Sequence, residues 1–510
     1  MNIRLLHPDG DVGRTREVPP HAADLAQDLG LETLWETMAG GDAFLAEVAR
    51  SVMLASLTDP EAITYRQRVL RDCLAHPAVV RQLYTVALEA ITGERKVYRS
   101  AFFRYPAGIL HGALEVMQLF LRQLRQLRAI ADAHADAFAS EGFRDLFATL
   151  QRDLSEDYLR QVEAHLRQLQ FRHGVLLSAR LGPGNKGRDY TLCRLPPDRR
   201  GWRRWLPGFD RAAAYTVVVP DRDESGLRAL SDLRDQGLNL AANALAQSAD
   251  HILGFFTTLR EALGFYLGCL TLWERLVAKG EPVCFPEPLP PGRHRFSCRG
   301  LYDVALSLRL ERRVVGNDVD ADDVALVVIT GANQGGKSTF LRSVGLAHLM
   351  LQCGMFVGAG TFRASLCEGL FTHYRREEDP TLQRGKWEEE LDRMRTIVER
   401  LTPRSLVLFN EAFAATNERE GAEIAGGIVR ALVEAGVRVF YVTHSYELAH
   451  RFTRERPDGV LFLRAHREPD GRRTFRLVPG EPLPTSYGED LYRQIFGEVD
   501  AVAPTGAGGR

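Results

Sequence analysis

Residues 324 to 338 read Val-Ala-Leu-Val-Val-Ile-Thr-Gly-Ala-Asn-Gln-Gly-Gly-Lys-Ser, an apolar β-branched run that leads into a glycine-rich loop. The loop fits the pattern G-x-x-x-x-G-K-[ST], and residues 339 to 344 continue it as a helix. Glycines let backbone N–H groups approach phosphates, and a helix N-terminus favours an anion. In such a loop the lysine reaches the β- and γ-phosphates and the Ser hydroxyl ligates Mg²⁺. We therefore expect the chain to bind ATP and Mg²⁺, with nucleotide contacts from Gly331, Ala332, Asn333, Gln334, Gly335, Gly336, Lys337, Ser338 and Thr339.

The composition shows no bias toward one class of partner. The 510 residues include 65 Lys and Arg against 66 Asp and Glu, which gives a formal net charge of −1, and 45% of the residues are hydrophobic. A chain of this length exceeds what one hydrophobic core organises, so we expect about two to four domains. The overall charge argues neither for nor against nucleic acid, because only a local basic patch would attract it.

The cysteines and the apolar segments indicate the cellular compartment in which the protein is expected. The seven cysteines are scattered and form no C-x-x-C pair, which favours reduced thiols over a disulfide framework or a zinc site. The first residues lack the apolar core of a signal peptide. The most apolar run, residues 344 to 359, contains His348 and Gln352 and is shorter than the roughly 20 residues that span a bilayer. We expect a cytoplasmic protein without a membrane partner.

Hydrophobic spacing predicts a mostly α-helical first half. Apolar residues recur at helical spacing through residues 31 to 173, where the runs at 110–130 and 143–171 predict two long helices. Residues 225 to 279 predict another long helix, and a cluster of prolines follows it. The expected fold is therefore multidomain, with a helical region over residues 1–290 that contains a small β-containing insertion near 174–220, and an α/β P-loop ATPase domain over residues 291–510.

Two short apolar runs, residues 175–179 and 215–220, predict strands inside this helical region. The loop between them sets arginines beside tryptophans, a mixture that suits phosphate contact and stacking on bases. A loop that packs its own tryptophans and exposes its arginines explains the same composition equally well. The candidate nucleic-acid contact consists of Arg199, Arg200, Trp202, Arg203 and Arg204.

Two later apolar runs end in polar residues that would complete a P-loop ATPase site. Residues 405 to 409 lead into Asn410 and Glu411, the positions from which such enzymes steady Mg²⁺ and polarise the attacking water. Asn410 can accept a hydrogen bond but carries no charge, whereas Glu411 can serve as a general base. Residues 437 to 442 lead toward His444, which can contact the γ-phosphate or the water. This order of P-loop, Asn-Glu and His is the order found in ABC-type ATPases.

Five segments in this order resemble the MutS family of DNA mismatch-repair ATPases. Residues 330–339, Thr-Gly-Ala-Asn-Gln-Gly-Gly-Lys-Ser-Thr, resemble the family's T-G-P-N-M-G-G-K-S-T, which is more specific than a general P-loop. The other matches are Val315-Gly316-Asn317-Asp318 to V-P-N-D, residues 405–411 with Ala415-Thr416 to S-L-V-L-x-D-E-x-x-x-G-T, Thr443-His444 with Glu447-Leu448 to T-H-x-x-E-L, and Ser486-Tyr487-Gly488 to S-Y-G. The resemblance implies a homodimer through ABC-type ATPase domains, with Glu411 and His444 as catalytic residues and Ser338 and Asn410 at the metal.

The resemblance also implies roles for more distant segments. Residues 57 to 67 resemble the start of the family's helical core, so that core and lever helices would occupy about residues 31–280 and leave no room for the N-terminal mismatch-recognition domains. The segment that acts on the partner's nucleotide, G-R-S-T-F-x-x-E in the family, corresponds here to Gly385, Lys386, Trp387 and Glu390. Asn410 replaces an aspartate, which predicts slow hydrolysis, and Val314 stands where a phenylalanine often stacks on adenine.

These features together predict an ATPase that couples ATP binding and hydrolysis to DNA binding or clamp movement on mismatched, branched or distorted DNA. A MutL-like protein or a nuclease is a candidate partner. An SMC-type clamp would need a long coiled coil between its half-sites, which the roughly 70 residues between Lys337 and Asn410 cannot supply. An alternative stays open, namely a nucleotide-dependent scaffold or an RNA- or ribosome-binding module with weak or no ATPase activity.

Overall fold

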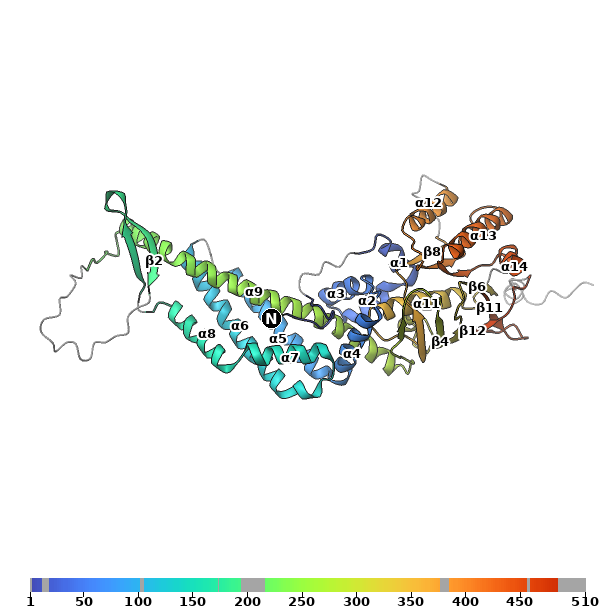
Figure 1. Cartoon of the computed structure of the whole chain (residues 1–510), viewed down its shortest axis with the longest axis horizontal. Coiled ribbons are helices and arrows are strands. Elements are labelled where there is room, and N and C mark those ends of the chain that lie inside the picture. Colours follow the sequence, from blue (N-terminus) through green and yellow to red (C-terminus); the bar gives the residue numbers. More distant parts are fainter. Residues whose placement is uncertain are drawn as a thin grey trace, which may run out of the picture.

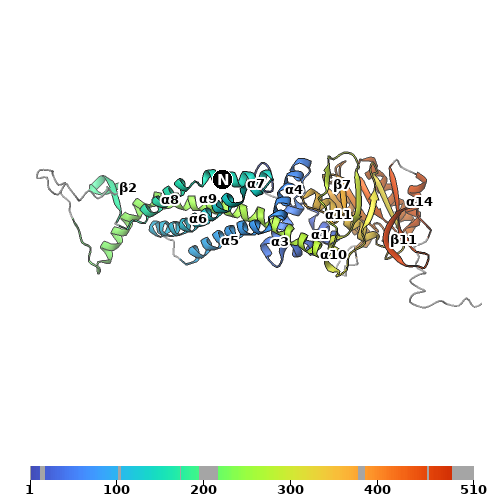
Figure 2. The same ribbon diagram turned by 90° about the horizontal axis from the view of Figure 1, so that it is seen from below.

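A computed structural model describes residues 2–11, 18–100, 105–172, 174–193, 216–376, 385–455 and 459–484. The molecule is elongated, with a helical arm extending from an α/β domain (Figures 1 and 2). The expected fold class, a mostly helical region followed by an α/β P-loop domain, is confirmed. Among the described residues, no helix is long and apolar enough to cross a bilayer.

The first half of the chain forms the helical arm and the base of the arm, which is the part of the helical region that contacts the α/β domain. Its helices are α1 (Ala22–Leu29), α2 (Leu31–Ala39), α3 (Ala43–Leu54), α4 (Pro60–Ala75), α5 (Pro77–Ser100), α6 (Pro106–His134), α7 (Glu141–Asp153), α8 (Glu156–Leu169) and the 55-residue α9 (Glu224–Ala278). Short 3₁₀ turns occupy Ala135–Ala137 and Pro183–Asn185. An antiparallel hairpin of β1 (Leu176–Leu181) and β2 (Gly187–Cys193) contacts α9 at the far end of the arm (Figure 1).

The second half forms the α/β domain. Its helices are α10 (Val304–Arg309), α11 (Lys337–Gln352), α12 (Lys386–Val398), α13 (Glu418–Glu434) and α14 (Tyr446–Glu455). Its strands are β3 (Glu287–Leu289), β4 (Phe296–Leu301), β5 (Asn317–Asp320), β6 (Leu326–Gly331), β7 (Thr361–Ser365), β8 (Leu370–Tyr374), β9 (Leu406–Asn410), β10 (Arg438–Val442), β11 (Val460–Arg467) and β12 (Arg473–Pro479).

The larger sheet of this domain has the strand order β12-β11-β6-β10-β9-β8, and the smaller one has the order β3-β7-β4-β5. In the larger sheet, all strands except the edge strand β12 run parallel. From β6 the chain crosses to β8 at the edge of the sheet, and it then returns through β9 and β10 to β11 on the other side of β6, so the direction of the connections reverses at β6. Open parallel sheets bind ligands outside the carboxyl ends of the strands at such a switch point.

Alternation along β6 explains why its apolar run is continuous. Val327 and Ile329 pack in the core that includes α11, whereas Leu326 and Val328 pack in a second core formed with α12, α13 and α14. Successive side chains of a strand point to opposite faces, so a strand covered on both faces must be apolar at every position.

The helix that follows the phosphate-binding loop is anchored at its far end to the helical region. The backbone N–H of Leu57 donates to Gln352 O at 2.8 Å, and Gln352 Nε2 donates to Leu57 O at 3.0 Å. The buried guanidinium of Arg66, on α4, donates to Cys353 O at 3.1 Å. A cation at the C-terminal end of a helix is favourable, so Arg66 links α4 of the helical region to the end of α11, the helix that follows the glycine-rich loop.

Two expectations about the arm were wrong in detail. The apolar run at residues 143–171 is two helices, because α7 ends at Asp153 and the Ser155 hydroxyl caps α8 by accepting from Tyr158 N at 3.3 Å. The described residues 216–220 form no strand; Val217 and Val218 are 83% and 82% exposed. The strand β1 pairs with β2. The turn between these two strands is closed by a hydrogen bond from the backbone N–H of Gly182 to Lys186 O at 2.8 Å.

Candidate nucleotide site

The glycine-rich loop runs from the end of β6 to the start of α11. Gly331 and Gly336 have φ values of 111° and 89°, a region that only glycine adopts without strain. The amino group of Lys337 turns back into the loop and donates to Gly331 O and Ala332 O, both at 2.9 Å. Burial lowers the pKa of Lys337 to about 8. The loop therefore holds a cationic donor and the N-terminus of a 16-residue helix at one point.

Ser338 and Asn410 meet across the edge of the sheet. The Ser338 hydroxyl donates to Asn410 Oδ1 at 2.8 Å. Asn410 ends β9, whose residues pair in register with β10, while β10 pairs with β6. These oxygen donors suit Mg²⁺, which is held in such sites by one or two protein groups and by substrate phosphates.

Glu411 and His444 form a close pair beside the loop. His444 Nε2 donates to Glu411 Oε1 at 2.6 Å, and this hydrogen bond holds the pKa of Glu411 below its usual value. Glu411 has a φ of 55° and is fixed through its N–H to Val442 O at 2.9 Å. Non-glycine residues in this conformation concentrate at functional sites. The carboxylate is ionised and oriented, as a general base requires.

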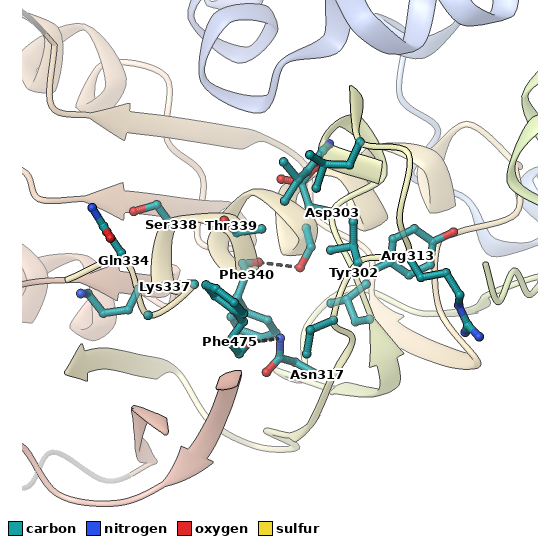
Figure 3. A pocket seen from close by; sticks show the side chains of 18 of the residues that line it. Tyr302, Asp303, Arg313, Asn317, Gln334, Lys337, Ser338, Thr339, Phe340 and Phe475 are labelled. Atoms are coloured by element: carbon teal, nitrogen blue, oxygen red, sulfur yellow. Dashed lines mark hydrogen bonds between the residues drawn. The ribbon is translucent and has the colours of Figure 1, made fainter. Parts of the chain in front are cut away.

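Gly336, Lys337, Ser338, Glu411 and His444 line one cavity of about 370 Å³, and Asn410 reaches it through its hydrogen bond with Ser338. Figure 3 shows Gln334, Lys337 and Ser338 toward one end, with Tyr302 and Arg313 toward the other. The apolar lining includes Leu301, Leu310, Val314, Val315 and Phe475. A polar end with an adjoining apolar end suits a triphosphate joined to a base.

Phe475 is a lining residue that the sequence motifs did not indicate. It comes from β12, has a φ of 58° and is 43% exposed. Asn317 fixes its position, because Asn317 Oδ1 accepts from Leu477 N at 2.7 Å and Asn317 Nδ2 donates to Phe475 O at 3.4 Å (Figure 3). The only signal in the sequence was Asn317 itself, which lies in the segment compared with V-P-N-D.

The segment expected to act on a partner's nucleotide begins at Gly385, which is the first described residue after residue 376. Gly385 precedes α12, and Lys386 is the first residue of that helix. Trp387 contacts Phe413 edge to face, with ring centroids 6.2 Å apart. Glu390 is 3% exposed, so its carboxylate faces the interior of its own chain. The action of this segment on a partner stays a prediction.

Two groups of expected residues fall outside the described part of the chain. These are the arginine- and tryptophan-rich cluster at residues 199–204 and the Ser-Tyr-Gly segment at residues 486–488.

Comparison with known families divides the chain in the same way as the fold. Residues 58–279 match the model of the MutS2 N-terminal domain, and residues 327–489 match MutS domain V, the P-loop ATPase domain. The first match covers the arm from α4 to α9, which the sequence motifs had assigned only loosely to core and lever helices.

Individual relatives agree with these matches. A protein of Porphyromonas gingivalis named DNA mismatch repair protein MutS is 33% identical over 486 residues, which are 84% of this chain and 52% of that protein. Proteins of the same name from Lactobacillus delbrueckii and Chloroflexus aurantiacus are 27% identical over 317 residues and 34% identical over 178 residues. The matched parts cover 34% and 18% of those two proteins. The chain thus spans about half of the length of these relatives or less. It belongs to the MutS family, and its nucleotide cavity lies in the family's ATPase domain.

Proposed function

We propose that the chain is an ATP-dependent DNA-binding protein of the MutS type, in which ATP binding and hydrolysis are coupled to DNA binding or to movement of the arm. The observation that supports this most strongly is the convergence on one cavity of Lys337, of Ser338 with its 2.8 Å hydrogen bond to Asn410, and of the Glu411–His444 pair at 2.6 Å. We further propose that residues 1–290 and 291–510 act as the helical and ATPase units.

Each residue of the site has a chemical role in this proposal. Lys337 exchanges its two carbonyl acceptors for phosphate oxygens when nucleotide binds. Ser338 and Asn410 would hold Mg²⁺, which would neutralise charge on the β- and γ-phosphates. Glu411 accepts a proton from the attacking water, and His444 keeps the carboxylate aimed at it. The apolar end of the cavity, with Phe475 and Val314, receives the adenine ring of ATP.

The arm and the partner belong to the same proposal. Two copies would close on nucleotide, each presenting the N-terminal end of α12, from Gly385 to Trp387, to the other. The connection from α11 through Arg66 to α4 would carry that closure into the arm. DNA of mismatched, branched or distorted form is the proposed ligand of the arms.

Steady-state ATP hydrolysis by the purified chain at fixed salt tests this proposal. The assay runs without nucleic acid and with matched duplex, mismatched duplex, a four-way junction and structured RNA, and Lys337→Ala is the control that lacks the phosphate-binding amine. We expect nucleotide binding that depends on Lys337 and stimulation by one DNA form. Unchanged nucleotide affinity in Lys337→Ala would refute the assignment of the loop.

Asn410 favours a second candidate, a nucleotide-dependent scaffold or an RNA- or ribosome-binding module with weak or no ATPase activity. An amide lacks the charge with which a carboxylate steadies the metal. Nucleotide binding without turnover in every arm of the assay, together with preferential binding of structured RNA, would favour this second function.

A further inference from the structure

Arg375 lies beside the catalytic residues although no motif includes it. It follows the last residue of β8, and Tyr374 pairs in register with Asn410. The backbone N–H of Arg375 donates to Asn410 O at 2.9 Å. The Cα atom of Arg375 is therefore held next to the strand end that carries Asn410 and Glu411.

The side chain of Arg375 is close to Glu411 but forms no hydrogen bond with it. Its Nη1 atom lies 3.9 Å from Glu411 Oε2, beyond the range of a hydrogen bond, and the side chain is 48% exposed. The residue lines a second cavity of about 320 Å³ that shares Glu411 and His444 with the nucleotide cavity. Lys337 and Arg375 both lie near Glu411, because the charge of each lowers the pKa of that carboxyl.

The guanidinium of Arg375 makes no hydrogen bond with another described residue, so its donors are available to an anionic ligand. Glu411 is already bound to His444 at 2.6 Å, and the buried Glu390 also lies near Arg375 but accepts no hydrogen bond from it. A guanidinium presents its donors as a planar fork that matches phosphate oxygens.

We propose that Arg375 is a further catalytic residue, which contacts the γ-phosphate of ATP bound to its own chain and stabilises the charge that develops during transfer. This inference rests on the proposed function. In the step, the water oxygen forms a bond to the γ-phosphorus while the bond from that phosphorus to the bridging oxygen of ADP breaks. Glu411 takes the water proton, and the products are ADP and inorganic phosphate. Arg375 forms no covalent bond and supplies positive charge, as arginine does in other phosphoryl-transfer sites.

The test compares Arg375→Ala and Arg375→Lys with the wild-type chain. Arg430→Ala is the matched control, because Arg430 is an exposed arginine on α13 that pairs with Glu455. Calorimetry measures the affinities for ADP and for a non-hydrolysable ATP analogue, and a separate assay measures turnover. We expect Arg375→Ala to lose about tenfold or more in affinity for the analogue, a loss typical of a charge-assisted hydrogen bond, while ADP affinity stays within about twofold. Turnover should fall, and Arg375→Lys should be intermediate because it keeps the charge and loses the fork.

Equal changes in ADP and analogue affinity, or no change in either, would overturn the inference. Faster turnover with unchanged analogue affinity would also overturn it, because Arg375 would then only neutralise Glu411. A wild-type chain that binds neither nucleotide would refute the proposed function itself. If the wild-type chain binds nucleotide and Arg375→Ala has the same affinities and turnover, only the role of Arg375 is refuted. Arg375→Lys preserves the charge and the backbone, so it decides the question if the alanine variant does not fold.

Discussion

Replacing Asn410 with aspartate would measure how strongly this site holds its metal. The Ser338 hydroxyl is 2.8 Å from Asn410 Oδ1, so a carboxylate of the same shape would lie where the amide lies now. A hydrogen bond to a neutral group contributes about 1 kcal/mol and one to a charged group about 2.4 kcal/mol, within the usual range of about 1.5 to 3 kcal/mol. The difference of about 1.4 kcal/mol corresponds to roughly tenfold in the affinity for Mg²⁺. Supporting groups around metal sites change affinity by about 10- to 100-fold, which is the same range.

The assay is a titration of free Mg²⁺ at fixed, saturating ATP, with the rate of hydrolysis as the signal. The Mg²⁺ concentration for half-maximal rate should fall about tenfold in Asn410→Asp. Asn410→Ala is the control, since it removes the acceptor of the Ser338 hydroxyl and should raise the requirement for Mg²⁺. Thermal unfolding establishes that both variants fold. If both variants fold and both keep the wild-type half-maximal Mg²⁺ concentration, the metal is not held by Ser338 and Asn410.

Three further predictions concern the same cavity. Glu411→Gln keeps the shape of the base but not its charge, so nucleotide affinity should stay close to wild type while turnover falls about 100-fold or more; a wild-type rate would place the base elsewhere. Burial lowers the pKa of Lys337 to about 8, so its charged form prevails below pH 8 and is lost above it. Because phosphate selects the charged form, the Kd for ATP should rise by up to about tenfold per pH unit above 8, and a flat profile from pH 7 to 9.5 would contradict this. Phe475→Ala should weaken ATP binding about tenfold by removing a ring that can stack on the base, and leave the affinity for inorganic triphosphate unchanged. An equal loss for both ligands would show that Phe475 does not contact the base.

The sequence indicates the candidate nucleotide loop directly because its chemistry is local. The glycines, Lys337 and Ser338 lie within one turn of backbone, and the motif fixes their order. Asn410, Glu411 and His444 could be added because each follows an apolar run, and parallel strands bring their carboxyl ends to one edge of a sheet. These motifs did not predict that β6, the strand before the loop, lies between β10 and β11, because strand order depends on long-range pairing.

The residues that were missed reach the site only through such pairing. Phe475 depends on the antiparallel pairing of β12 with β11, and Arg375 on the register between β8 and β9. The strand predicted at residues 215–220 was wrong because β-branched residues favour a strand only where a neighbouring strand can complete the ladder. Val217 and Val218 have no such neighbour within the described part of the chain.

The length of α9 has a mechanical consequence for any change at the nucleotide. Its 55 residues form one helix from the β1–β2 hairpin to the base of the arm, where it packs on α2, α3 and α4. At 1.5 Å per residue this helix measures about 80 Å, so a tilt of about 5° at its base displaces its far end by about 7 Å. A displacement of that size exceeds the rise of two base pairs of duplex DNA, which is about 3.4 Å for each. In the proposed dimer, a tilt too small to disturb the packing at the base of the arm would therefore move the two arm ends relative to one another by whole base-pair steps.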